Sequence, residues 1–300
     1  MTTNIGWELY RSFLGVLTEG SLSGAARALG IIQPTVGRHV SALEKSLGLV
    51  LFTRSQTGLM PTQGALALRG YAQAMRSTAA ALERAAEGQS GGEEVKGTVR
   101  VSASEVVGVE VLPPILGQLQ QAHPQLRIEL VLSNRVQDLL RMEADIAVRM
   151  TPPKQDLLIA RRVGEVKVGL HARDSYLQRR GVPRTPADLA QHVLIGFDAE
   201  TPFLRTVTKA VPFLRRAAFS LRSDSDLAQL ALMRAGCGIG ACQVALARRD
   251  PSLVRVLPRH FAFGLETWVA MHEDLRSSPR CKATFDALVR GLEAYCRPAS

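Results

Sequence analysis

Four side chains that can hydrogen-bond to base edges lie close together early in this 300-residue sequence: Gln33, Thr35, Arg38 and His39. Pro34 can occupy the first turn of a helix, because the N–H that proline lacks would have no partner there. A helix beginning at residue 33 would carry all four side chains on its first two turns. If that end of the helix enters a DNA major groove, Arg38 is best suited to contact guanine through two hydrogen bonds. The pattern predicts a helix that reads bases.

The residues around this cluster predict the two helices that must position it. Ser21 can cap a first helix, which would end at Gly30 because glycine adopts a positive φ without strain. The small Ala25–Ala26 pair allows a second helix to approach closely, and we expect Ile31–Ile32 to fill the junction. The second helix has apolar residues at helical spacing, namely Val36, Val40, Leu43 and Leu47. This arrangement is a helix-turn-helix.

A short hairpin is predicted directly after the second helix. Residues 51–54 and 59–62 have the pattern of two strands, and Gly58 lies in the turn between them. Such a hairpin would form the wing of a winged helix, in which Arg54 contacts the minor groove or the phosphate backbone. On spacing alone, an ordinary pair of helices followed by a hairpin remains the alternative.

Five segments of this region occur in a familiar order and spacing: Ser21–Ala26, Gln33–Val36, Leu43–Gly48, Leu51–Arg54 and Pro61–Gly64. In this respect the chain resembles the winged helix of LysR-type transcriptional regulators. The resemblance implies a DNA-binding surface made of Ser23, Gln33, Pro34, Thr35, Arg38, His39 and Arg54. One position differs, because the family commonly has serine where this chain has Gly37. Glycine in a helix interior costs up to about 1 kcal/mol relative to alanine, and it removes a hydroxyl that could touch phosphate.

A long helix is predicted from residue 63 to residue 88. Thr62 is a suitable N-cap, no proline interrupts the segment, and small or apolar residues recur at coiled-coil spacing: Ala65, Ala72, Met75, Ala79, Leu82 and Ala86. A helix packed on its own domain remains an alternative. We expect a homodimer through residues 63–88, and the resemblance implies a homotetramer.

The glycine-rich run from residue 88 to residue 97 separates this helical part from an α/β part. Strands are predicted at 99–101, 126–132 and 146–148, with helices between them that include Val136–Met142, and this order favours a mainly parallel sheet. A second set of strands is predicted at 166–170, 192–197, 219–221, 253–257 and 267–271. Helices are predicted near Ser223 and from Pro279.

The resemblance continues through this α/β part, in segments such as Gly97–Val101, Ala144–Arg149, Asp188–His192 and His272–Arg276. It implies an effector-binding domain of two α/β lobes, like that of periplasmic binding proteins. The predicted domains are a winged helix-turn-helix at 1–62, a linker and dimerisation helix at 63–92, and an effector domain at 93–300. Within the last, lobe I comprises 96–165 and 267–300, and lobe II comprises 166–266.

Polar residues at strand ends are the candidates for binding a small effector between the lobes, because ligands of such sheets lie at the carboxyl ends of the strands. They are Ser102, Ser104, Glu105, Ser133, Asn134, Arg149, Phe197 and Asp224. Arg149 directly follows the apolar strand 146–148, where it could hold an anionic effector or pair with an acidic side chain. For each residue, a structural role such as helix capping is the alternative.

Other classes of protein find less support in the sequence. No metal-binding or catalytic motif is visible, so we expect no metal, no cofactor and no enzyme activity. No stretch resembles a membrane span or a secretory signal, so we expect a cytoplasmic protein without a membrane partner. Cys237 and Cys242 leave open a redox-sensing regulator, and the bilobed α/β design leaves open a solute-binding module without a DNA role.

The net charge of +10 is a weak argument for nucleic acid once it is divided along the chain. Residues 1–63 carry 5 basic and 3 acidic side chains, whereas residues 96–300 carry 29 and 20. The excess therefore lies in the effector part, where it favours anionic ligands or adds weak attraction to DNA. The prediction of a double-stranded DNA operator as partner depends on residues 20–64.

Overall fold

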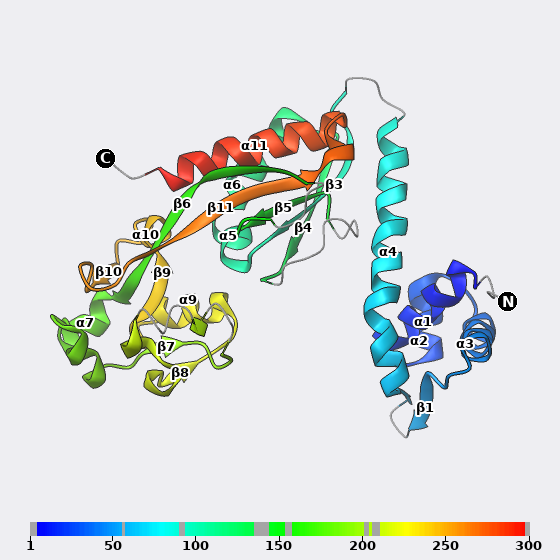
Figure 1. Ribbon diagram of the computed structural model, residues 1–300, viewed down its shortest axis with the longest axis horizontal. Coiled ribbons are helices and arrows are strands. Elements are labelled where there is room, and N and C mark those ends of the chain that lie inside the picture. Colours follow the sequence, from blue (N-terminus) through cyan, green and yellow to red (C-terminus); the bar gives the residue numbers. More distant parts are fainter. Residues whose placement is uncertain are drawn as a thin grey trace. The chain divides into compact units, whose positions relative to one another are not determined.

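The computed structural model describes residues 5–55, 58–89, 94–134, 144–153, 158–200, 204–205 and 211–297. The chain divides into two compact units, of which the first is residues 1–85 and the second begins at residue 86. Each unit is a separate body with its own core (Figure 1).

The first unit contains three helices, a hairpin and most of one long helix. Their bounds are α1 Trp7–Glu19, α2 Leu22–Leu29, α3 Gln33–Leu47, β1 Phe52–Ser55, β2 Gly58–Pro61 and α4 Gln63–Gln89. Ser21 caps α2, since its hydroxyl accepts a hydrogen bond from the backbone N–H of Gly24 at 3.0 Å. Gly30 ends the same helix in the left-handed conformation, with a φ of 67°. The predicted helix-turn-helix and its hairpin are thus present at the predicted residues.

The core of this unit lies where α1, α2, α3 and α4 meet. Phe13, Val36 and Leu43 are fully buried there. Ala65 and Ala72 of α4 are buried in the same core, so the first part of the predicted dimer seam packs on its own domain. The prediction that Ile32 fills the junction is also wrong: Ile32 is the N-cap of α3 and is 66% exposed, because the turn directs it away from the core.

The second unit is built on one curved sheet in the strand order β10-β6-β11-β5-β3-β4, with β9 beside β6. The strands are β3 Gly97–Ala103, β4 Leu126–Leu132, β5 Ile146–Arg149, β6 Leu158–Arg173, β9 Gly240–Gln243, β10 Leu253–Val256 and β11 Phe263–His272. Only β3 with β4 and β3 with β5 are parallel, whereas the pairs that involve β6 or β11 are antiparallel. The predicted mainly parallel sheet is wrong, because the returning strand β11 inserts between β5 and β6 in the opposite direction.

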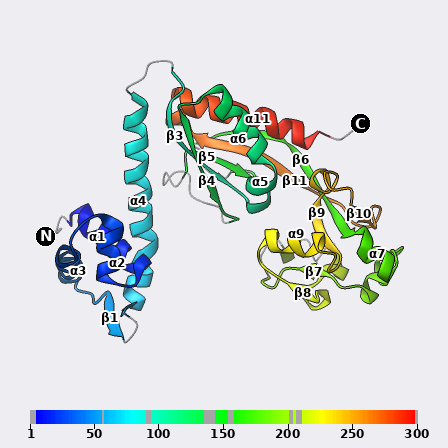
Figure 2. The ribbon, with the colours of Figure 1, turned by 180° about the vertical axis from the view of Figure 1, so that it is seen from behind.

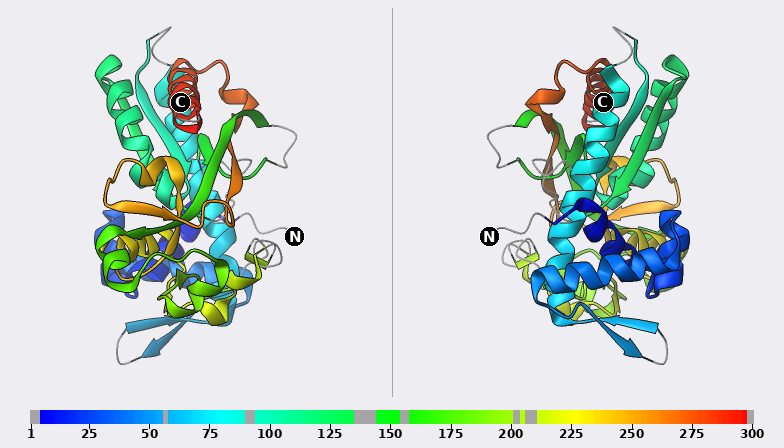
Figure 3. Two further views of the ribbon diagram at one scale, coloured as in Figure 1. Left: turned by 90° about the vertical axis from the view of Figure 1, so that its left-hand side faces the viewer. Right: turned by 90° about the vertical axis from the view of Figure 1, so that its right-hand side faces the viewer.

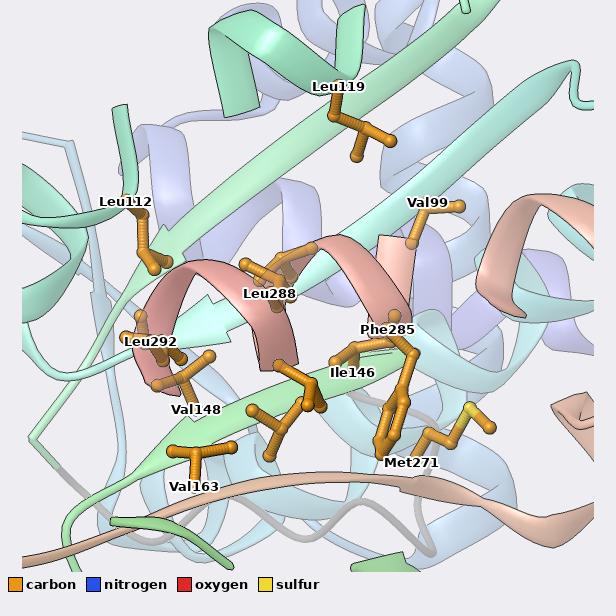
Figure 4. Close-up of a cluster of buried hydrophobic side chains, with 14 of the residues drawn as sticks. Val99, Leu112, Leu119, Ile146, Val148, Val163, Met271, Phe285, Leu288 and Leu292 are labelled. Carbon is orange, nitrogen blue, oxygen red and sulfur yellow. The ribbon is translucent and has the colours of Figure 1, made fainter. Parts of the chain in front are cut away.

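Helices α5 Glu105–Glu110, α6 Leu112–Ala122 and α11 Pro279–Cys296 belong to the β3–β5 end of this unit, which we call lobe I. The apolar stripe of α11 packs on one face of the sheet, where Leu288 and Leu292 lie near Ile146 and Val148 (Figure 4). The alternation along β5 therefore directs Ile146 and Val148 toward α11, and it directs Arg149 to the opposite face.

The other end of the unit, which we call lobe II, shares β6 and β11 with lobe I. Figures 2 and 3 show these two strands running without a break from one lobe to the other. Lobe II also contains α7 Asp174–Arg180, β7 Ile195–Gly196, β8 Leu221–Arg222, α9 Asp226–Arg234, α10 Val244–Ala247 and the short 3-10 turns at 186–191, 212–214 and 216–218. The predicted strands at 192–197 and 219–221 are here only two residues long. The predicted helix Val136–Met142 lies outside the described residues.

Candidate nucleic-acid interface and effector site

The first two turns of α3 present the predicted base-reading residues. Gln33, Pro34 and Arg38 are exposed, and Thr35 is half-buried. Val36 and Val40 on the opposite side of the helix are buried in the core, so the helix cannot rotate to hide its polar side. The Nη2 atom of Arg38 donates to Thr35 Oγ1 at 3.3 Å, and the side chain is otherwise exposed. This end of α3 has the exposure that a groove-reading helix requires.

His39 is more restrained than the other candidates. Its Nδ1 atom shares a 2.8 Å hydrogen bond with Ser12 Oγ, and Ser12 lies on α1 with only 1% of its surface exposed. The bond ties α3 to α1 and leaves only the Nε2 atom of the ring for another partner. The sequence did not indicate Ser12, because its partner is 27 residues away in the chain.

Glu44 fixes the hairpin to α3, a role that the sequence did not reveal. One carboxylate oxygen, Oε1, accepts hydrogen bonds from the backbone N–H groups of Leu51 at 2.7 Å and Phe52 at 3.3 Å. On the other side, the N–H of Leu59 donates to Gly20 O at 2.9 Å. Arg54 is exposed on β1 of this tethered hairpin, and Ser23 is exposed on the first turn of α2. The wing is therefore held to α3 through Glu44 and to the end of α1 through Gly20.

Gly37 is not required by the backbone of α3. Its φ is not positive, and a Cβ added there would meet only Leu22 Cδ1, at 3.7 Å. We expect Gly37→Ala to raise the free energy of unfolding by about 0.5–1 kcal/mol, because alanine restricts the unfolded chain and favours the helix. Urea denaturation of both proteins at the same concentration measures the difference. A lower free energy of unfolding in Gly37→Ala would contradict this prediction and would show that position 37 of α3 requires glycine.

Arg149 and Ser102 are brought together on the sheet face opposite α11. Arg149 Nη2 donates to Ser102 Oγ at 2.8 Å, and Nη1 donates to Val148 O at 2.9 Å. Burial lowers the pKa of the Arg149 guanidinium. No acidic side chain of the described residues forms an ion pair with Arg149. The described residues therefore offer no support for the alternative that Arg149 pairs with an acid of its own chain.

Glu105 and Asn134 meet lobe II directly. Asn134 accepts from the N–H of Glu105 at 3.0 Å and donates through Nδ2 to Asp226 Oδ2 at 2.8 Å. Ser225, the N-cap of α9, donates to Glu105 Oε2 at 3.3 Å. Burial, and then the charge of Glu105, raise the pKa of Asp226. The sequence predicted a helix near Ser223, but Ser225 and Asp226, which lie at the start of α9, were not among the candidate effector residues.

The remaining predicted effector residues have local roles. Ser104 is the N-cap residue of α5, without a capping bond from its side chain. The N–H of Ser133 donates to Ala103 O at 2.9 Å. Asp224 Oδ1 accepts from the N–H groups of Asp198 at 3.0 Å and Ala199 at 2.8 Å, so this carboxylate holds a loop of its own lobe. Phe197 lines a pocket of about 280 Å³ within lobe II, together with Leu214, Phe219 and others.

Both parts of the chain match known families. Residues 7–66 match the family described as "Bacterial regulatory helix-turn-helix protein, lysR family", and residues 92–293 match the one described as "LysR substrate binding domain". The chain belongs to the LysR family. It is a transcriptional regulator with a helix-turn-helix DNA-binding domain and an effector-binding domain.

Similarity to known proteins extends over nearly the whole length of this LysR-family regulator. The "Probable HTH-type transcriptional regulator LtrA" of Klebsiella pneumoniae is 27% identical over 295 residues, which is 94% of this chain and 93% of that protein. Full-length AphB of Vibrio cholerae aligns with a TM-score of 0.61 at 22% identity, over 95% of this chain and 99% of that one. Full-length CbnR complexed with its target DNA aligns with a TM-score of 0.66 at 20% identity, over 95% and 99% of the two chains. These two structures share its fold.

The alternative of a redox sensor finds no support in this LysR-family structure. Burial raises the pKa of the Cys242 thiol to about 12, so almost none of it is the reactive thiolate at neutral pH. Cys237 and Cys242 are both free thiols. Among the described residues, no cluster of side chains could hold a metal ion and no helix is long and apolar enough to cross a membrane.

An ion pair also joins the two lobes of this regulator. Glu110 of α5 accepts from Arg234 Nη1 at 2.6 Å and from Nη2 at 2.9 Å, and its backbone oxygen accepts from Arg249 at 2.8 Å. The hydrogen bonds from Arg234, and then the charges of Arg234 and Arg249, lower the pKa of Glu110 although burial opposes the shift. The sequence did not predict this bridge, because its partners are 124 residues apart.

The lowered pKa of Glu110 predicts how the bridge depends on pH. For an acid whose pKa is lowered by folding, the added stability is complete above the ordinary pKa and disappears as the pH falls through the folded value. We expect Glu110→Gln to lower the free energy of unfolding at pH 7 by about 0.5–1 kcal/mol, a value reduced by the partial exposure of Arg234. The difference should vanish well below pH 4.5. Urea denaturation at pH 7 and at lower pH tests this, with Glu129→Gln in an exposed pair as the control. A difference independent of pH would contradict it.

Proposed function

We propose that this regulator binds its operator by inserting the N-terminal end of α3 into the major groove, and that a small anionic effector held near Arg149 changes this binding. The observation that supports the first part most strongly is the polarity of α3. Its exposed first turns carry Gln33 and Arg38, while Val36, Val40 and Leu43 hold its other side in the core. A helix that is buried along one side and exposes hydrogen-bonding groups at its N-terminal end fits a major groove.

Each predicted DNA-binding residue receives a specific part in this proposal. Gln33, Thr35 and Arg38 contact base edges, with Arg38 contacting a guanine through two hydrogen bonds. His39 has only Nε2 left for a base or a phosphate, because Nδ1 is bonded to Ser12. The N-terminal backbone of α3 around Pro34 faces a phosphate. Ser23 of α2 and Arg54 of the wing contact the sugar–phosphate backbone.

The test of sequence-specific binding is selection from randomised DNA duplexes, carried out with the full-length protein. We expect the retained duplexes to converge on a motif in two similar halves, spaced so that their centres lie on the same side of the DNA. Binding of the selected duplex should weaken steeply with salt because phosphate contacts release counterions. Retained duplexes without any common motif would contradict the proposal.

We further propose that α4 joins two copies of the chain. Ala65 and Ala72 are buried in the first unit, but Tyr71, Met75 and Leu82 are 68%, 39% and 73% exposed. Large exposed apolar side chains along a helix of 27 residues, about 40 Å in length, favour pairing with a second copy. The proposed assembly is a homodimer through residues 63–88, and two such dimers would form a homotetramer.

The effector is proposed to act at the contacts between the lobes. The candidate residues in lobe I are Ser102, Ser104, Glu105, Ser133, Asn134 and Arg149, with Phe197 and Asp224 in lobe II. Glu105 and Asn134 already hydrogen-bond to Ser225 and Asp226 of lobe II. A ligand that competes for these bonds would change how the lobes are held, and its binding energy would then favour one arrangement over another.

We also propose the division of the chain into a DNA-binding domain at 1–62, a linker and dimerisation helix at 63–92, and an effector domain at 93–300.

The proposed mechanism consists of binding alone. We propose that the chain acts in the cytoplasm, where bacterial DNA lies, and that it catalyses no reaction. Double-stranded DNA, a small effector and further copies of the same chain are its proposed partners.

A further inference from the structure

The indole N–H of Trp268 is a buried hydrogen-bond donor that has no acceptor among the described residues. Trp268 lies on β11, and its Nε1 atom has almost no contact with solvent. Buried N–H groups are nearly always hydrogen-bonded in folded proteins, because a donor removed from water without a partner is costly. A donor of this kind needs an acceptor, and a bound ligand or a buried water can supply one.

Trp268 lies next to the candidate effector residue Arg149. The two residues are direct neighbours across the antiparallel pair of β11 and β5. Directly opposed residues point to the same face of a sheet, with Cβ atoms about 4.5–5.5 Å apart. Val148 and Val269, one position away on the two strands, are buried in the core under α11. Arg149 and Trp268 therefore share the opposite face of the sheet (Figure 4 shows Val148 on the α11 side).

A β-bulge sets the position of Trp268 on this face. Thr267 pairs with Gly164 on β6, but Trp268 pairs with Arg162, so β6 contains one extra residue at this point. Thr267 faces the α11 side, where its Oγ1 atom lies 3.2 Å from Met150 Sδ. Bulges bend a strand and redirect a side chain, and they are frequent beside binding sites. The bulge falls where β6 and β11 pass from one lobe to the other.

Arg149 supplies the second group of free donors at this place. A guanidinium has five N–H donors, and the described contacts use one to Ser102 Oγ and one to Val148 O. Its positive charge has no carboxylate partner within the described residues. A half-buried cation and a buried N–H donor on one face of the sheet are complementary to an anion that carries two acceptor oxygens.

We propose that Arg149 and Trp268 together bind one carboxylate group of the effector, with one oxygen on the guanidinium and the other on the indole N–H. This inference depends on the proposed effector function and specifies its ligand class. A monovalent carboxylate matches the charge of Arg149, because Arg162, the neighbour of Trp268 on β6, is already paired with Glu266 at 3.0 Å. A phosphate would bring up to two negative charges to the same place. Ser102 is a positioning residue, since its hydroxyl oxygen holds the Arg149 side chain.

The test uses the two tryptophans of the chain, Trp7 and Trp268, in the full-length protein labelled with ¹⁵N at tryptophan. Sodium acetate is titrated at constant ionic strength, with inorganic phosphate and sodium chloride in parallel titrations. We expect acetate to move one indole N–H resonance in a saturable manner, and this resonance should persist in Trp7→Phe. Phosphate and chloride should leave it in place.

Two variants separate ligand contact from packing. Trp268→Phe keeps an aromatic ring but lacks the N–H, and we expect it to bind acetate about tenfold more weakly, as judged from acetate-induced thermal stabilisation. Trp7→Phe should match the wild type in that assay, and Arg149→Gln should show no saturable stabilisation. A saturable response to phosphate without one to acetate would overturn the carboxylate assignment. An indole resonance that no anion moves would overturn the site.

The outcome is independent of whether the chain recognises DNA as proposed. Acetate binding is measured without DNA, and selection from randomised duplexes is measured without acetate. A selected motif together with silent indole resonances would overturn the carboxylate site and leave operator binding intact. Saturable acetate binding in a protein that selects no DNA motif would overturn the proposed operator binding and leave the carboxylate site intact.

Discussion

Replacing Arg38 with alanine is expected to weaken binding to the selected operator about tenfold to a hundredfold. A side chain that makes two hydrogen bonds to one base contributes about 1–3 kcal/mol of discrimination, and that free energy corresponds to such a change in affinity. Arg38 is exposed, and its only described contact is the 3.3 Å bond to Thr35, so the fold should be unaffected. Fluorescence anisotropy with the labelled operator measures the affinity, and urea denaturation checks the fold.

The matched control for this substitution is Arg11→Ala. Arg11 is also exposed and also in the first unit, but it lies on α1 and not on the proposed reading helix. Loss of its charge should change the affinity for every DNA sequence alike and only slightly. If Arg38→Ala and Arg11→Ala weakened operator binding equally, Arg38 would contribute charge alone and its role in reading bases would be rejected.

Replacing Leu82 with glutamate is expected to separate the dimer. Leu82 is 73% exposed on α4, and in a symmetric dimer both copies would bury it. Each buried leucine contributes about 1.5–3 kcal/mol, and two glutamates would bring negative charges into the same interface. We therefore expect dimer affinity to fall at least about a hundredfold. Analytical ultracentrifugation over a range of protein concentrations measures this.

Operator binding should fall with dimerisation, since two linked reading helices bind far more tightly than one. The control is Gln73→Glu, which adds the same charge at an exposed polar position of α4. It should leave the dimer intact. A Leu82→Glu protein that sediments as the wild type does would show that α4 is not the interface.

The helices of the first unit could be predicted because their signals are local. Ser21 and Gly30 mark the ends of α2, and Pro34 marks the start of α3. Such residues act on backbone groups within a few positions, so the sequence alone locates them. The hydrogen bonds between Glu44 and the wing were missed, because the donors to a carboxylate cannot be inferred from spacing when they are backbone N–H groups of a following segment.

The second unit was harder to predict because strand direction is not a local property. The residue types of β5 and β11 indicated two strands, but nothing in those residues shows that β11 returns antiparallel between β5 and β6. Because the pairing of β11 with β5 could not be predicted, Trp268 was not expected to be a neighbour of Arg149. Arg149 itself was a candidate because it directly follows an apolar strand. Asp224, which stays a candidate effector residue, accepts hydrogen bonds from the N–H groups of Asp198 and Ala199. Sequence spacing could not predict these bonds, because a carboxylate at a strand end can accept from any nearby backbone N–H group.

Our central claim is that α3 reads base edges through Arg38, and the most direct measurement replaces one atom of the DNA. Guanine N7 is an acceptor in the major groove, and 7-deazaguanine lacks it while still pairing with cytosine. Operators that carry 7-deazaguanine at each conserved guanine in turn are compared for binding to the wild type and to Arg38→Ala. We predict one position in each half of the operator at which the replacement weakens the wild type severalfold but leaves Arg38→Ala unchanged. Equal losses in both proteins at every position, or no loss in the wild type, would contradict the claim.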